Sequence, residues 1–271
     1  MNATLEGRSD VFSVAFALEG TLVATGDLER TAFERLCAES ALLHPGRTGR
    51  FTPAETYAEH QAALEDGGEA LNGIIAQAIG AATGVTDAKP RALAARYRQI
   101  SREVAAETAA PLPGVERTLD ELRRLGVPQA ILANGLSSPE SRKAQSLGFT
   151  GKVLVSEDIG AKKPDPRAFA ALLGALMLPP EALWYVGSNL EVDIKPAHDA
   201  GMTVVWVAPG AEGVPPQFES RFHRVHQIDE VLELIKEPYT RAMLGLRYVM
   251  HNALTWRPGH FVQGEEYGLG G

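Results

Sequence analysis

Six short apolar runs, separated by stretches with helical spacing, limit the fold of this chain most strongly. The runs lie at residues 11–18, 127–133, 152–156, 182–187, 202–208 and, more weakly, 222–226. A short run that is apolar throughout is typical of a strand buried on both faces of a parallel sheet. Strands that alternate with helices form right-handed β-α-β units. We therefore predict an α/β fold, with a parallel sheet covered by helices on both faces.

The segment between the first and second runs is helical and interrupts the alternation. Asp27 precedes an apolar stripe formed by Leu28, Phe33, Leu36, Cys37 and Ala41. Residues 54–108 are rich in alanine, and two Gly- and Pro-containing interruptions divide them into three helices. An insertion here lies above the strand ends, where such folds bind ligands. We predict a sheet core of residues 1–27 and 109–236, a helical cap of residues 28–108 and a C-terminal extension of residues 237–271.

Composition and charge exclude several classes of protein. The 271 residues carry a net charge of −8, which argues against binding to nucleic-acid phosphates. A single cysteine, Cys37, excludes a disulfide framework and favours the cytoplasm. Glu6 and Asp10 precede the first apolar run, so the N-terminus does not resemble a signal peptide. No apolar run approaches the ~20 residues that span a bilayer. We expect a cytoplasmic protein that binds neither nucleic acid nor membrane.

Four short motifs follow the predicted strands at their carboxyl ends. They are FALEGTL at 16–22, ILANG at 131–135, KKPDP at 162–166 and YVGSNLEVD at 185–193. In order and spacing they resemble the motifs of the haloacid dehalogenase (HAD) superfamily of phosphatases and related hydrolases. The resemblance covers residues 11–235 and implies a Rossmann-like core with an α-helical cap that closes over the substrate.

The resemblance also implies a mechanism. In that family the first motif reads D-x-D-G-T-L, and its first Asp attacks phosphorus to form an aspartyl-phosphate. The second Asp protonates the leaving group and then activates water. Mg²⁺, held by the first Asp and by acids of the fourth motif, neutralises the phosphoryl oxygens. A hydroxyl of the second motif and the lysine of the third hold the transferred group.

This sequence departs from the family pattern at four positions. The nucleophile position is Ala17, and the acid/base position is Glu19. The hydroxyl position is Ala133, and the first acid of the fourth motif is Ser188. We therefore predict a catalytically inactive or very weak phosphatase homologue that acts by binding a ligand or a protein. The alternative is an active hydrolase, of the phosphatase or dehalogenase class, whose chemistry is re-routed through Glu19.

The family motifs also indicate which residues are candidates for the site. Glu19 and Lys163 are the candidates for catalysis, and the candidates for binding a small anionic ligand are Gly20, Asn134, Gly135, Lys163 and Asn189. Asp193 is the candidate metal ligand, but its partner positions are Ala17 and Ser188. We therefore expect no cofactor, and Mg²⁺ only if the site is retained.

Each of these residues also has a structural interpretation. Lys163 pairs with Glu19 or Asp193 in that interpretation, Glu19 faces solvent, and Asp193 bonds the backbone of its own loop.

The last part of the chain lies outside the alternating pattern. Apolar residues there follow a helical spacing, at Met243, Leu246, Met250 and Leu254. Trp256, Phe261 and Tyr267 follow in a Gly-rich stretch. Aromatic residues and Met are enriched at protein interfaces. Residues 239–271 are thus predicted either to contact a protein partner or a second copy of the chain, or to pack on their own core.

Overall fold

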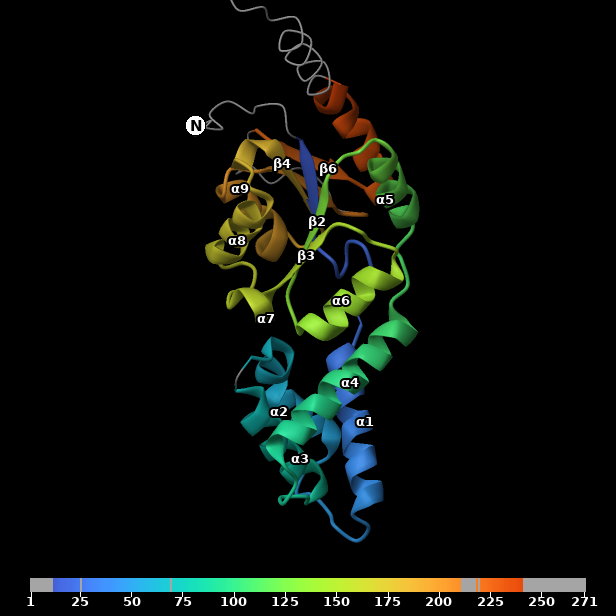
Figure 1. Cartoon of the computed structure of the whole chain (residues 1–271), viewed down its shortest axis with the longest axis vertical. Helices are drawn as coiled ribbons and strands as arrows, with labels where there is room; N and C mark the ends of the chain where they lie inside the picture. Colours follow the sequence, from blue (N-terminus) through green and yellow to red (C-terminus); the bar gives the residue numbers. More distant parts are fainter. Residues whose placement is uncertain (1–11, 25, 69, 211–217, 219, 241–271) are drawn as a thin grey trace, which may run out of the picture.

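The computed structural model describes residues 12–24, 26–68, 70–210, 218 and 220–240. Its centre is a six-stranded sheet in the order β3-β2-β1-β4-β5-β6, in which all neighbouring strands are parallel (Figure 1). The strands are β1 (Ser13–Phe16), β2 (Gln129–Ala133), β3 (Lys152–Val155), β4 (Leu183–Gly187), β5 (Thr203–Val207) and β6 (Phe222–Val225). The predicted parallel α/β sheet is confirmed.

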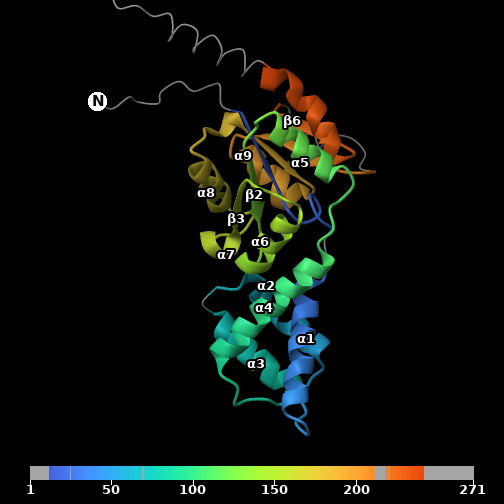
Figure 2. The same ribbon diagram turned by 45° about the vertical axis from the view of Figure 1, so that its right-hand side comes forward.

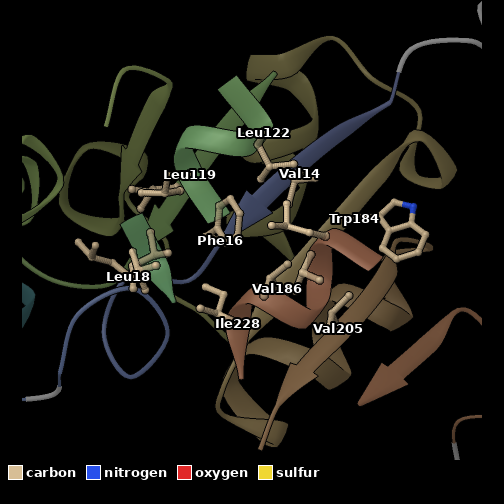
Figure 3. Packing of buried hydrophobic residues seen from close by; sticks show 14 of the residues in the cluster. Val14, Phe16, Leu18, Leu119, Leu122, Trp184, Val186, Val205 and Ile228 are labelled. Atoms are coloured by element: carbon tan, nitrogen blue, oxygen red, sulfur yellow. The ribbon is translucent and has the colours of Figure 1, made fainter. Parts of the chain in front are cut away.

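Both faces of the sheet are buried because helices cover each of them. Val14 and Phe16 of β1 point into one hydrophobic cluster, and Ala15 between them points into the other. The first cluster includes residues of α5 (Val115–Arg124), α6 (Ser137–Ser146) and a helix at 231–240, and Figure 3 shows part of it. The second includes residues of α8 (Pro166–Leu176) and α9 (Lys195–Asp199). The alternation along β1 explains why its sequence is apolar throughout.

Short helical turns complete the sheet region. They are α7 (Ser156–Ile159), the 3₁₀ turns η1 (Pro180–Ala182) and η3 (Ile228–Glu230), and the π-helical turn η2 (Leu190–Ile194). The 3₁₀ turn η3 leads directly into an α-helix that is described from residue 231 to residue 240.

Four of the described helices between β1 and β2 pack around a hydrophobic cluster of their own. They are α1 (Leu28–Leu43), α2 (Pro53–Asp66), α3 (Leu71–Thr83) and α4 (Pro90–Thr108). Figures 1 and 2 show this helical block beyond one end of the sheet. Contact with the sheet region runs mainly through α4 and α6. The division of the chain at residues 28 and 109 into cap and core stays a prediction.

Three helix ends show how local sequence acts. Asp165 accepts a hydrogen bond from the Arg167 N–H (2.8 Å) and thereby caps the start of α8. Helix α6 begins at Ser137, directly after Leu136. Ala41 is exposed in the last turn of α1 and does not belong to the buried stripe.

Some predictions fall on parts of the chain that the structure does not describe. The N-terminal residues 1–11 and the predicted contact surface within 241–271 lie outside the described residues. Among the helices that are described, none combines the length and the apolar character needed to cross a membrane.

Candidate functional site

The turn after β1 forms the predicted nucleophile position. Ala17 follows the last residue of β1, and its N–H donates to the Val186 carbonyl of β4 (2.8 Å). The side chain is 1% exposed. Gly20 has a φ of 69°, and its N–H donates to the Val23 carbonyl (2.7 Å), which closes the turn. The backbone of the turn is therefore well supported, while residue 17 contributes only a methyl group.

Glu19, the candidate acid/base, forms an ion pair with Lys143 of α6. The Lys143 ammonium also bonds Glu140 Oε1 (2.7 Å), and these two side chains are 4% and 1% exposed. The Glu19 side chain is 34% exposed, so it connects this buried pair to solvent. Glu19 thus faces solvent in part, as its structural interpretation expects, and Lys143 also holds its carboxylate.

Charge in this group is unbalanced, with two carboxylates around one ammonium. Burial raises the pKa of Glu140 to about 7, although the nearby Lys143 ammonium opposes this shift. Burial would lower the pKa of Lys143, but the attraction of Glu140 and Glu19 outweighs it and raises the pKa. Among the described residues, Glu140 Oε2 has no hydrogen-bond partner. Burial beside a single ammonium therefore favours the protonated form of Glu140.

Lys163 and Asp193 form a second buried group on the other side of β1. The Lys163 Nζ donates to Asp193 Oδ1 (2.6 Å) and to the Tyr185 hydroxyl (3.3 Å). Asp193 Oδ2 accepts from the Asn189 N–H (3.1 Å). Lys163 thus pairs with Asp193 and not with Glu19, and Asp193 bonds its own loop as predicted. Gly187 is required beside this pair, because a Cβ there would lie 2.6 Å from the Asp193 Cβ.

The predicted ligand-binding residues make bonds within the protein. The Asn134 side chain accepts from the Lys163 N–H (2.8 Å) and donates to the Lys163 carbonyl (2.9 Å). The Gly135 N–H donates to Ser156 Oγ (2.9 Å). The Asn189 side-chain oxygen accepts from two backbone N–H groups of the next turn (3.0 Å each). These residues fix the loops around the strand ends, and their contact with a ligand stays a prediction.

The donor set does not fit the Mg²⁺ that the family resemblance implies. Both Asp193 oxygens are already bonded, and the positions of its partners hold Ala17 and Ser188. Within the described part of the chain, no group of three or more His, Cys, Asp or Glu side chains is placed to hold a metal ion. Function without a cofactor stays a prediction.

Sequence reasoning missed three residues of these two groups. Glu140 and Lys143 lie one turn apart in α6, which has few apolar residues to mark its buried side. Their spacing of three was the available signal. Tyr185 lies in the fully buried strand β4, where a hydroxyl needs a polar partner.

The motif resemblance agrees with comparisons to known proteins. The family model for haloacid dehalogenase-like hydrolases matches residues 14–201. Glyceraldehyde 3-phosphate phosphatase from Methanopyrus kandleri is 29% identical over 204 residues, which are 73% of this chain and 84% of the relative. Phosphoserine phosphatase from Thermus thermophilus is 36% identical over 108 residues, which are 39% of this chain and only 43% of the relative.

Solved structures show the same fold. The 2-haloacid dehalogenase from Pseudomonas syringae pv. tomato superposes with a TM-score of 0.60 at 19% identity, over 84% of this chain and 99% of the other. A HAD phosphatase from Thermococcus onnurineus gives a TM-score of 0.56 at 18% identity, over 83% and 98%. Since the family model matches more than half of the sequence and the fold agrees, the chain belongs to the haloacid dehalogenase-like hydrolase family.

Proposed function

We propose that this family member does not form an aspartyl-phosphate and acts by binding a ligand or a protein partner, as an inactive or very weak phosphatase homologue. The observation that carries this function is the Ala17 side chain at the carboxyl end of β1. It is 1% exposed and has no lone pair with which to attack phosphorus. The named activities of the phosphatase relatives belong to those proteins.

The polar groups that remain near this turn support the same function. The Lys163 ammonium, which would hold a phosphoryl group, is 6% exposed and bonded to Asp193. Asn134 uses both ends of its amide on the Lys163 backbone. A phosphoryl group entering here would have to break these bonds before it gained any of its own.

A second candidate function follows from the exposure of Glu19. This carboxylate is 34% exposed and lies two residues beyond the missing nucleophile, so solvent reaches it. An active hydrolase would use it as a nucleophile or as a base for water, after release from Lys143. This is the re-routed chemistry that the sequence leaves open.

Two substrates separate these functions. We expect the purified chain to hydrolyse neither p-nitrophenyl phosphate with Mg²⁺ nor 2-chloropropionate without metal. Turnover in the wild type that disappears in Glu19→Gln would establish the re-routed hydrolase instead. Turnover that is equal in the wild type and in Glu19→Gln would show that another group of the protein or a contaminant is responsible.

We also propose a cytoplasmic protein without a resident cofactor, with two kinds of partner. One is a small anionic ligand, and the other is a protein or a second copy of the chain that contacts residues 239–271. Sedimentation of the full chain and of a form ending at residue 238 tests the second. An equal mass per particle in both would count against self-association through this segment.

A further inference from the structure

A groove lies between α4 of the helical block and α6 of the sheet region. Its volume is about 730 Å³. All of its lining residues are polar, and they are Gln99, Arg102 and Glu103 of α4 and Ser137, Ser138, Ser141, Arg142 and Gln145 of α6. Figures 1 and 2 show the two helices next to each other. These side chains supply hydrogen-bonding groups to a ligand in the groove.

The charge of the groove is positive in a chain whose net charge is −8. Arg102 and Arg142 lie on opposite walls, both are exposed, and neither has an ion-pair partner among the described residues. The acid in the groove, Glu103, pairs with Arg96 (3.3 Å) and accepts a hydrogen bond from Gln99 (3.0 Å). Two guanidinium groups without an ion-pair partner among the described residues therefore face one carboxylate, Glu103, which shares Arg96 with Glu39.

Hydroxyl groups of α6 add hydrogen-bond donors along one wall of the groove. Ser137 Oγ is buried and has no hydrogen-bond partner in the described part of the chain. Ser138 and Ser141 are half-buried and line the same wall. Glu140 and Lys143 lie on the inner side of this helix, where they form the buried cluster with Glu19. The helix thus separates the groove from the turn after β1.

We propose that this groove is a binding site for a small molecule that carries a phosphate group. Guanidinium groups form paired hydrogen bonds with phosphate oxygens, and serine hydroxyls supply further donors. Arg102 comes from the helical block and Arg142 from the sheet region, so each part contributes one guanidinium group to the groove. None of the groove residues lies in the four family motifs, and the site does not depend on whether residue 17 is reactive.

Calorimetric titration of the full chain with pyrophosphate tests this site. We expect saturable binding that weakens as NaCl is added, because exposed charges are screened by salt. Arg102→Ala and Arg142→Ala should each weaken binding about tenfold or more. The matched control is Arg91→Ala, an exposed arginine of the same helix α4 that lies outside the groove, and it should bind as the wild type does. Circular dichroism verifies that each variant is folded.

Two results would overturn the proposal. One is the lack of saturable binding at millimolar pyrophosphate, and the other is equal affinity in the wild type, Arg102→Ala and Arg142→Ala. Crystals soaked in tungstate, a phosphate analogue with a strong anomalous signal, locate the anion directly. A peak between Arg102 and Arg142 supports the site, and a peak only in the cleft near Lys163 contradicts it.

Discussion

Two lysines are buried near the carboxyl ends of the strands, and their surroundings differ in charge. Lys163 faces one carboxylate, Asp193, and the Tyr185 hydroxyl. Lys143 faces two carboxylates, Glu140 and Glu19. The first group is neutral as a pair, whereas the second has one negative charge too many for its single ammonium. The burial of an unmatched carboxyl explains why the pKa of Glu140 rises to about 7.

The largest effect is expected where a balanced pair is broken. Lys163→Met leaves the Asp193 carboxylate buried without its cation and should lower the free energy of unfolding by about 3–5 kcal/mol. The neighbouring Lys162 pairs with Asp66 at the surface, where the two side chains are 53% and 49% exposed. Lys162→Met should cost about 1 kcal/mol or less. Urea denaturation at neutral pH measures both.

This pair of variants can refute the comparison. Equal losses of stability in Lys162→Met and Lys163→Met would mean that Lys163 is not held in a buried ion pair. The arrangement of the loop that carries Asp193 would then need another explanation.

The unbalanced group predicts a dependence of stability on pH. Between the ordinary pKa of a glutamate, 4.5, and about 7, the folded chain holds a proton on Glu140 that the unfolded chain has lost. Stability should therefore fall as pH rises through this range, by at most about 3 kcal/mol. In Glu140→Gln this contribution is missing, so unfolding curves recorded from pH 5 to 7.5 should show a flatter dependence.

An exposed glutamate provides the control for this experiment. Glu116 lies in the first turn of α5, and Glu116→Gln should keep the slope of the wild type. If Glu140→Gln and the wild type have the same slope, the buried carboxyl is not protonated near neutral pH.

A smaller effect is expected at the contact between the helical block and the sheet region. Glu157 accepts from Arg98 of α4 (2.8 and 2.6 Å) and from the N–H groups of Gly68 and Ser137. Burial alone would raise the pKa of Glu157, but these donors outweigh it and lower the pKa to about 2. Glu157→Gln should cost about 1 kcal/mol at pH 7, since solvent screens the partly exposed Arg98.

The dependence of stability on pH that we expect from Glu157 is opposite in sign to that expected from Glu140. A lowered pKa stabilises the fold above pH 4.5, and the stabilisation disappears as pH falls toward 2. The difference between the wild type and Glu157→Gln should therefore narrow in acid, as thermal unfolding at pH 3 and 7 will show. A difference that stays constant with pH would assign the loss to packing and not to charge.

The sequence predicted the sheet because each strand is buried on both faces and is therefore apolar throughout. It placed Lys163 near Glu19 and Asp193, because all three lie in motifs that follow strands, but it left open which of the two carboxylates pairs with the lysine. It did not predict Lys143 and Glu140, because partners distant in the chain decide which side of the polar helix α6 is buried. Leu136 shows the same limit, since it lies directly before α6 and is buried in the cluster of the distant helical block.

The central claim has two parts. The backbone of the loops at the strand ends keeps the arrangement of the family, and the reactive side chains of the family are missing. Binding of Mg²⁺ tests both parts. We predict that millimolar Mg²⁺ does not change the melting temperature of the wild type, because Ala17 and Ser188 supply no carboxylate. The double variant Ala17→Asp with Ser188→Asp should bind Mg²⁺ and melt several degrees higher when the ion is present. Stabilisation of the wild type by Mg²⁺, or a folded double variant that binds none, would contradict the account.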